Sequence, residues 1–377
     1  TLEDIQAGML HTAAKLADRP IAGLVALPLM TEPHKLAALE ILVTISASSY
    51  QSFPALFPLV VLEQVNISLD YGNGPLSPFG YMTYAMVLGG LLEDFNTAIQ
   101  FGQMALALAR KLEAQKIYGK ILFLFNNNLH HHKEHLRLTL EDLLASSILT
   151  MELGDPEYAS LSRLAYVQHL FYAGVRLDEV QHEMQVATDM MRDVKQEVAL
   201  RFTNIFRQAV LNLVADTEHP WVLSGAAHDE TIPIPANEVT TLYCVYSVKG
   251  MLDYWFDRCA PAAEAIDIAL TALPGAIGLA GVPIVYFYAG LIKLAIYPTA
   301  ADAEKEVLLA SVDASQAKLK QRAEHAPMNH LHRWVLVEAE RQRVLGHAAE
   351  ASELYERAVA LATENNYVHE AALANEL

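Results

Sequence analysis

Apolar residues recur along most of this chain at spacings of three and four, which is the period of a helix that buries one face. No segment alternates apolar and polar residues over the length that a sheet strand requires. Clusters of Gly, Pro, Asn and Asp interrupt the helical pattern, as at residues 72–75 and 154–156. The pattern therefore predicts an all-α protein built from consecutive helices.

The stretch at residues 346–358 is the clearest local signal. It places a turn glycine before a helix that carries Ala351, Tyr355 and Ala358 on one face. This arrangement is typical of the second helix of a tetratricopeptide-type hairpin. In such hairpins the alanines let two helices approach closely, and the aromatic ring fills the space between them.

The same spacing returns at other places in the chain. When His332, Tyr243 and Phe79 are each taken as the first residue of a hairpin, small residues fall at the expected positions. These residues are Ala339, Ala351 and Ala358, then Gly250, Ala262 and Ala269, and finally Ala98 and Ala105. The next start would lie near Tyr367, which suggests a unit of about 35 residues. We therefore predict a superhelical solenoid of antiparallel, tetratricopeptide-like hairpins.

A long irregular stretch at residues 216–239 separates two helical regions. It contains several residues that end helices, namely Pro220, Gly225, Pro233 and Pro235. We interpret it as a linker or bend between an N-terminal helical-repeat half, residues 1–215, and a C-terminal tetratricopeptide-like half, residues 240–377. The sequence opens without Met and stops within a helical pattern, so we expect a fragment of a larger protein.

Composition and charge narrow the classes of partner. Hydrophobic residues make up 53% of the chain, and the formal net charge is −18. Such a charge repels nucleic acids and anionic membranes, because both are bound through cations. We therefore expect neither as a partner. Cys244 and Cys259 are too few for a disulfide framework, which favours a cytoplasmic location.

An apolar run at residues 275–297 has the nominal length of a membrane span. Glycines and Pro283 interrupt its first third and leave a helical part, residues 284–297, that is too short to cross a bilayer. We interpret this part as a buried helix. The glycines at residues 275–281 lack the preceding strand that a nucleotide-binding loop needs, so we expect a linker there.

A histidine-rich run at residues 126–135 is the main candidate for metal chemistry. On a helix, His131 and His135 would share one face, as in many metal-binding helices. Residues at ligand spacing do not complete a convincing third ligand, so we expect a solvated hairpin turn, no metal and no cofactor. A nucleophile, base and oxyanion site is not recognisable either, and we predict that this chain is not an enzyme.

The concave side of the predicted stack is a better place for function, because the first helix of each hairpin lines it. On this basis we predict a face for a ligand or partner that includes Tyr84, Gln168, Phe171, Arg207, Arg333, Glu340 and Arg343. Arginines on such a face suit the recognition of a carboxylate or phosphate. The alternative is that they pair with glutamates on their own helices.

Three stretches, with a fourth that fits them, resemble one family of signalling proteins. They are residues 27–39 (LPLMTEPHKLAAL), residues 326–334 (APMNHLHRW) with 338–341 (EAER), residues 370–377 (EAALANEL), and residues 66–72 (NISLDYG). The chain is similar to the helical segment of multidomain proteins that carry a protein-kinase-like domain, a signalling ATPase domain, a GAF domain and a histidine kinase. These motifs are structural, so no catalytic residue is carried over.

The resemblance implies a sensor and coupling segment of an intracellular, signal-transducing ATPase–histidine kinase. Its partners would be the ATPase, GAF and kinase modules of the same protein, with a peptide or small-molecule effector in the concave groove. Two alternatives remain open. The first is a stand-alone scaffold that binds a partner peptide, and the second is a metal-dependent helical-repeat enzyme that uses His131 and His135.

Overall fold

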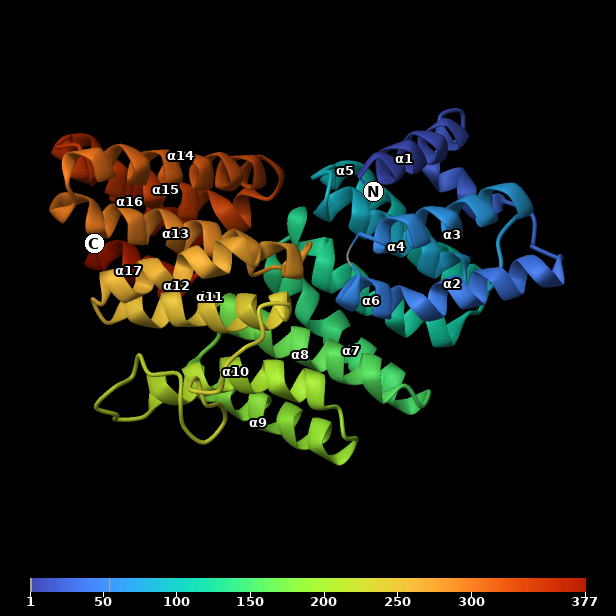
Figure 1. Cartoon of the computed structure of the whole chain (residues 1–377), viewed down its shortest axis with the longest axis horizontal. Helices are drawn as coiled ribbons and strands as arrows, with labels where there is room; N and C mark the ends of the chain where they lie inside the picture. Colours follow the sequence, from blue (N-terminus) through green and yellow to red (C-terminus); the bar gives the residue numbers. More distant parts are fainter. Residues whose placement is uncertain (1, 54) are drawn as a thin grey trace. The chain divides into compact units, whose positions relative to one another are not determined.

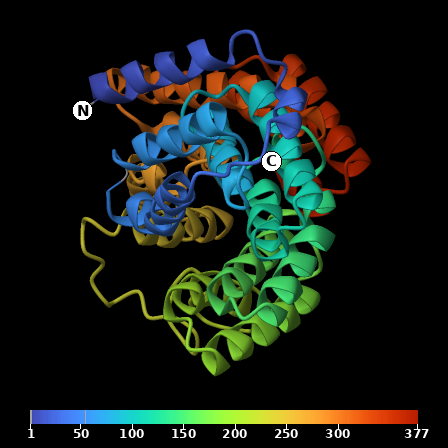
Figure 2. The same ribbon diagram turned by 90° about the vertical axis from the view of Figure 1, so that its right-hand side faces the viewer.

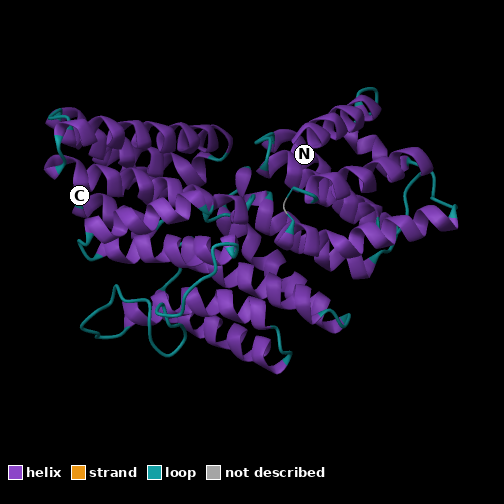
Figure 3. Cartoon of the chain, in the orientation of Figure 1, coloured by secondary structure: helices purple, strands orange, loops and turns teal. Residues whose placement is uncertain are grey.

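The computed structural model describes residues 2–53 and 55–377, and it consists of helices joined mostly by short connections (Figure 1, Figure 3). Within these described ranges there is no strand, and one isolated bridge joins Leu29 to Asn73. The prediction of an all-α protein is therefore confirmed. The three-to-four period of apolar residues accounts for it, because each helix buries one stripe against its neighbours.

The chain forms two compact units. Unit 1 comprises the residues up to His130 together with Asp142–Ala159, and unit 2 comprises His131–Glu141 together with Ser160–Leu377. The helices of unit 1 are α1 (Leu2–Leu16), η1 (Ile21–Ala26), α2 (Pro33–Ser52), α3 (Phe57–Tyr71), α4 (Ser77–Gly90), α5 (Phe95–Lys111), α6 (Gln115–Asn128) and most of α7 (Thr139–Glu152).

Unit 2 opens with two short 3-10 helices, η2 (His130–His132) and η3 (Leu136–Leu138). Its remaining helices are most of α8 (Pro156–Tyr172), then α9 (Leu177–Asp193), α10 (Glu197–Val214), α11 (Val239–Trp255), α12 (Cys259–Thr271), η4 (Leu273–Ala276), α13 (Val282–Ile296), η5 (Tyr297–Thr299), α14 (Asp302–His325), α15 (Pro327–Val344), α16 (Ala348–Glu364) and α17 (Val368–Glu376). Helices that follow one another in sequence pack together, as α9 and α10 do in both views (Figure 1, Figure 2).

One type of turn recurs between consecutive helices. At the turn from α8 to α9, Gly174 has a φ of +65°, and its N–H donates to the carbonyl of Phe171 at 3.1 Å. The N–H of Val175 donates to the carbonyl of Leu170, also at 3.1 Å. This pair of bonds is the Schellman motif, which satisfies the last carbonyls of a helix and reverses the chain. The same pair surrounds other left-handed residues, namely Glu113, Gly154, Lys195, Asp257, Gly346 and Asn366.

The hairpins predicted from small residues are present as packed helix pairs. Ala339 of α15 meets α16, where Ala351 and Ala358 are buried. In unit 1, Ala98 and Ala105 of α5 are fully buried on the side that packs against α4. The close approach is possible because an alanine adds only one methyl group between the two helix backbones.

The structural unit is longer than predicted. α17 begins next to Tyr367, as expected, but α15 already begins at Pro327, five residues before His332. α8 and α10 likewise begin at Pro156 and Glu197, which gives a unit of about 40 residues in both cases, against the 35 predicted. The difference arises because these helices run to 17 or 18 residues each.

The predicted boundary at residues 216–239 lies inside unit 2 and does not separate the two units. The stretch is irregular, as predicted, but side chains tie it to unit 2. The amide of Asn212 on α10 donates to the carbonyls of Pro220 at 3.0 Å and Val222 at 2.7 Å. Lys249 on α11 pairs with Glu230 at 2.8 Å. These contacts hold the segment against α10 and α11 and explain why it is not a domain linker.

The apolar stretch Val282–Thr299 has the length and composition of a membrane span, and 61% of it is buried within the protein. It comprises α13 and the short η5, and α13 packs against α12, α14 and α15. Burial among helices accounts for its apolar composition without a membrane.

Unit 1 contains a contact between two of the stretches that resemble the signalling family. The N–H of Asn73 donates to the carbonyl of Pro28 at 2.8 Å, and the N–H of Met30 donates to the carbonyl of Asn73 at 3.0 Å. Gly72 has a φ of +93°, and a Cβ there would lie 2.2 Å from the carbonyl oxygen of Pro28. Only glycine allows this approach, so Gly72 has a structural role in joining the two stretches.

Glycine-to-alanine substitutions test the turns. Gly154 and Gly346 have φ values of +77° and +86° and open space where a Cβ would lie, so Gly154→Ala and Gly346→Ala should each cost about 1 kcal/mol. At Gly174 the Cβ would also lie 2.0 Å from Nδ1 of His369. We therefore expect Gly174→Ala to lower the free energy of unfolding by about 1–3 kcal/mol more than either control. Urea denaturation measures this, and equal losses in all three variants would contradict the contact.

Candidate functional site

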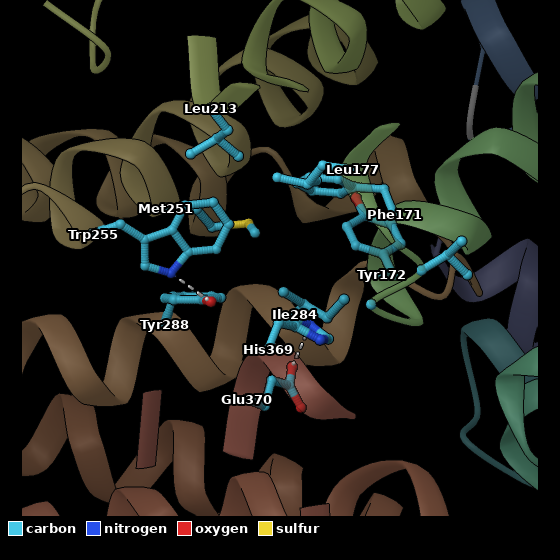
Figure 4. Close-up of a pocket in the computed structure, with 12 residues that line it drawn as sticks. Phe171, Tyr172, Leu177, Leu213, Met251, Trp255, Ile284, Tyr288, His369 and Glu370 are labelled. Carbon is cyan, nitrogen blue, oxygen red and sulfur yellow. Dashed lines mark hydrogen bonds and ion pairs between the residues drawn. The ribbon is translucent and has the colours of Figure 1, made fainter. Parts of the chain in front are cut away.

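Unit 2 contains a pocket of about 240 Å³ between helices that are far apart in sequence (Figure 4). Its walls come from the end of α8, from the turn that follows it and the first residue of α9, from α10, α11 and α13, and from the first turn of α17. Trp255 and Met251 lie towards one end of the pocket, and Phe171 and Leu177 lie towards the other. Most lining residues are apolar or aromatic, which is typical of small-molecule sites.

Aromatic rings on α11 and α13 are held in a fixed orientation at one end. The indole Nε1 of Trp255 donates to the hydroxyl of Tyr288 at 3.0 Å. The two rings meet nearly edge to face, with centroids 5.9 Å apart, and Tyr254 contacts Tyr288 in the same way. Burial raises the pKa of Tyr288, so its hydroxyl stays neutral. The rings therefore form a rigid apolar wall of the pocket, in which the hydroxyl of Tyr288 is a polar group.

Glu370 is the charged residue of the pocket. Its carboxylate is 2% exposed and accepts from Nε of Arg333 at 2.9 Å and 3.0 Å, and it is also bonded to Nε2 of His332. Burial alone would raise the pKa of Glu370, but Arg333 and His332 outweigh it and lower that pKa to about 2. Burial lowers the pKa of His332, so this residue donates as a neutral ring. Glu370 is therefore ionised in the folded protein.

His369 is the second polar group in the lining. Its Nε2 lies 3.7 Å from Oε1 of Glu370, which is too long for a hydrogen bond, and its side chain is 35% exposed. Nδ1 has no hydrogen-bond partner among the residues that the structure describes. Burial lowers the pKa of His369, so the ring is neutral at neutral pH and offers one donor and one acceptor.

Two residues of the predicted face belong to this site. Phe171 lines the pocket. Arg333 does not line it, but it donates a hydrogen bond to the lining residue Glu370. Arg333 is buried and paired with Glu370 from α17, an arrangement that neither of the two interpretations of the arginines included. That pairing is between different helices and was not visible from spacing along one helix.

Glu340 and Arg343 form a separate cluster away from the pocket lining. The guanidinium of Arg343 donates to both carboxylate oxygens of Glu340 at 2.7 Å, and the hydroxyl of Tyr355 also bonds to Glu340. Glu340 raises the pKa of Arg343 through this hydrogen bond, so the guanidinium stays charged. Here the alternative interpretation, pairing within one helix, is the observed one.

The other predicted face residues do not join the pocket lining either. Tyr84 is 3% exposed in the core of unit 1, where its ring meets Phe101 edge to face at 5.0 Å. Burial also raises the pKa of Tyr84. Arg207 donates to the amide oxygen of Gln185 on the neighbouring helix α9. Gln168 is half-buried on α8. Tyr84 is thus a packing residue and not a surface group.

The histidine-rich run is not a solvated turn, contrary to the prediction. His131 is 2% exposed, and its Nε2 donates to the carbonyl of Gly278 at 3.1 Å. His135 lies outside a helix, and its Nε2 donates to the carbonyl of Asn365 at 2.8 Å. The expected shared helical face is therefore absent, because residues 133–135 are not helical. Across the described chain, acidic, histidine and cysteine side chains do not gather into groups suited to a metal ion.

Asn329 anchors this run to the rest of unit 2. Its amide donates to the carbonyls of His131 at 2.8 Å and Glu134 at 2.7 Å. Its carbonyl oxygen accepts from the N–H of Leu136 at 3.0 Å and from the hydroxyl of Tyr367 at 2.8 Å. The side chain is 1% exposed and uses both its donor and acceptor groups. It belongs to residues 326–334, one of the stretches that resemble the signalling family.

Sequence reasoning missed most of the pocket. Trp255, Tyr288 and His369 were not singled out, and Glu370 appeared only as the first residue of a quoted stretch. The available signal was that residues 326–334 and 370–377 were both quoted for the same resemblance. The structure joins them through Arg333 and Glu370.

Comparison with known proteins gives limited information. No family model matches the chain, and no solved structure matches it. The chain is similar to the hybrid signal transduction histidine kinase G of Dictyostelium discoideum, with 25% identity over 143 residues. This similarity covers 37% of the chain and spans 4% of that kinase. It is a partial likeness to a signal-transduction protein.

Replacing Asn329 tests its anchoring role. Asn329→Ala leaves buried backbone groups without partners, and each such group costs about 1–3 kcal/mol. We expect the free energy of unfolding to fall by about 3 kcal/mol or more. The control is Asn375→Ala on α17, whose exposed amide bonds only to the carbonyl of Ala371, and which should change stability by less than about 0.5 kcal/mol. Similar losses in both variants would contradict the anchoring role.

Buried histidines make unit 2 sensitive to mild acid. Burial lowers the pKa of His132, His169 and His330 well below the ordinary value of 6.5. The unfolded chain takes up protons near pH 6.5 while the folded protein does not, so stability falls as pH drops below 6.5. The full slope of about 1.4 kcal/mol per pH unit and histidine is reached only well below pH 6.5. Over the whole window from pH 7.5 to 5.5, which is centred on 6.5, each histidine therefore contributes a loss of about 1.4 kcal/mol, or about 4 kcal/mol for the three.

The variant His330→Phe isolates one of these contributions. His330 is 3% exposed, and both ring nitrogens lack hydrogen-bond partners within the described part of the chain, so phenylalanine conserves the packing. We expect the loss of stability between pH 7.5 and 5.5 to shrink by about 1.4 kcal/mol in this variant. Urea denaturation at the two pH values measures it, and an unchanged loss would contradict the assignment.

Proposed function

We propose that this chain is a helical-repeat sensor and coupling segment of a signal-transducing histidine kinase. The pocket in unit 2 would be its effector site. The observation that carries the proposal is one pocket that is lined by six helices, namely α8, α9, α10, α11, α13 and α17. The partial similarity to a hybrid histidine kinase supports the signalling context.

The proposal includes a tetratricopeptide-like solenoid as the architecture. Packed neighbouring helices, buried alanines and the recurring Schellman turns support it. In a stack of this kind each hairpin contacts mainly its neighbours, so small changes in spacing add up along the stack.

The coupling mechanism follows from the pocket walls. A ligand that touches α8, α11 and α17 together favours the spacing of these helices in which all its contacts are made. A ligand shifts a conformational equilibrium only through different affinities for the two states. We propose that this preference reaches ATPase, GAF and kinase modules of the same polypeptide in the cytoplasm.

The role we propose is binding and not catalysis. Glu370 is the ionised group of the pocket, and it is engaged by Arg333 and His332 rather than poised as a free base. Its low pKa makes it a weak proton acceptor.

A protein-interaction scaffold is the second candidate. A shallow groove between α8 and α9 supports it, because Tyr166 and Leu170 lie there beside Asp178, Glu179 and Glu183. Such a groove suits a basic, partly apolar peptide. Binding of a peptide without any response to small molecules would favour this candidate.

A thermal-shift screen of the 377-residue chain against amines, sugars, nucleotides and carboxylates tests the effector site. A true ligand at a hundredfold excess over its Kd stabilises the folded state by about 2.7 kcal/mol. We expect one chemical class to raise the Tm. Leu213→Trp, on a half-buried wall residue of α10, should abolish the rise by filling the pocket, whereas Val198→Trp, 48% exposed on the same helix, should preserve it.

The coupling half of the proposal has its own readout. Autophosphorylation of the full-length gene product should respond to the ligand found in the screen, and Leu213→Trp should remove that response. An autophosphorylation rate that stays unchanged after deletion of the whole segment, with and without ligand, would overturn coupling.

A further inference from the structure

We infer that the unit 2 pocket selects a small protonated amine. Its apolar body would lie between the aromatic walls, and its ammonium group would donate to Oε1 of Glu370. This assignment rests on the pocket being the effector site proposed above, and it adds the chemical class of the effector.

The charge of the lining favours a donor and opposes an anion. Among the residues that line the pocket there is a carboxylate, Glu370, but no lysine or arginine side chain. Arg333 lies behind Glu370, where its charge is matched. The pair of Arg333 and Glu370 is neutral overall, but an incoming carboxylate or phosphate would find no lysine or arginine in the lining to bind it. An ammonium group, by contrast, would find an acceptor in Glu370.

One oxygen of Glu370 has capacity for a further bond. Oε2 accepts from both Arg333 and His332, whereas Oε1 accepts from Arg333 alone. A carboxylate has about four acceptor positions, so Oε1 retains room for a donor. The Glu370 oxygen joined by a dashed line to His369 in Figure 4 lies on the side of the pocket.

The aromatic walls add a second attraction for a cation. Trp255 and Tyr288 line one end of the pocket, and Phe171 and Tyr172 line the other. The faces of aromatic rings attract cations, and the attraction is strongest for desolvated groups. A carboxylate together with several aromatic rings is therefore better matched to an amine than to a neutral molecule of the same shape.

The groove next to the pocket also favours cations over anions. The groove between α8 and α9 shares Val175 with the pocket and contains Asp178, Glu179 and Glu183. The whole chain has a net charge of −18, which raises the local concentration of cations.

The volume limits the size of the ligand. A space of about 240 Å³ corresponds to the liquid volume of about eight water molecules. This admits one ring with a short side chain. The effector class is thus a compact apolar amine of roughly ten non-hydrogen atoms.

Three probes with the same ring and different head groups test the inference. They are 2-phenylethylamine, 2-phenylethanol and phenylacetate, titrated into the 377-residue chain by isothermal calorimetry. We expect the amine to bind at least about tenfold more tightly than the alcohol, and phenylacetate to show no binding. Equal or tighter binding of phenylacetate would overturn the inference.

Two variants place the binding in the pocket. Glu370→Gln should remove the preference for amine over alcohol, and its folding is checked by its Tm because Arg333 loses its partner. Leu213→Trp keeps that pair and should abolish amine binding, whereas Val198→Trp should leave it unchanged. Amine binding that survives Leu213→Trp would overturn the inference even if Glu370→Gln fails to fold.

The outcomes separate this inference from the function on which it rests. If another chemical class raises the Tm and Leu213→Trp removes the rise, the effector pocket stands and the amine assignment fails. If the amine binds in the pocket but autophosphorylation does not respond, the assignment of an amine as the ligand is upheld and the proposed coupling role is contradicted.

Discussion

The buried pair of Arg333 and Glu370 is the interaction on which the rest of unit 2 depends. Removing one partner of such a pair costs about 3–5 kcal/mol, because an uncompensated charge remains in the interior. The pair joins α15 to the first turn of α17 and holds Glu370 at the edge of the pocket. The same carboxylate therefore has a structural role and supplies the acceptor of the proposed effector site.

Near this pair, hydrogen bonds from polar side chains hold the histidine-rich run in place, whereas elsewhere in the chain the packing of apolar helix faces holds the segments together. The histidine-rich run has little regular structure, yet its backbone is satisfied by Asn329, and its rings donate to carbonyls at two distant turns. Buried backbone groups need such partners, so the run is ordered by hydrogen bonds rather than by an apolar stripe. The cost is that several neutral histidines are buried close together, which ties the stability of unit 2 to pH.

The walls of the pocket come from six helices, α8, α9, α10, α11, α13 and α17, and from the turn between α8 and α9. Helices α8 and α17 meet at the pocket through Phe171 and Glu370, although they are far apart in sequence. In the coupling mechanism that we propose, occupancy of the pocket would favour one arrangement of these helices, and a stacked architecture would pass that preference to neighbouring hairpins. The partial likeness to a hybrid histidine kinase fits such a role in signalling.

The sequence by itself determined the helical class, the hairpins around Ala339, Ala351 and Ala358, and the irregular stretch at residues 216–239. These features depend on local period, small residues and helix-ending residues, all of which are readable along the chain.

The tertiary structure alone decided which residues form the pocket. Phe171 and Arg333 were predicted for a binding face, but the partner of Arg333 is Glu370 from another helix, and Tyr84 turned out to be buried in unit 1. It also decided that the histidine run is buried and that the irregular stretch lies within unit 2. Such pairings depend on contacts between distant segments, which neither periodicity nor spacing along one helix records.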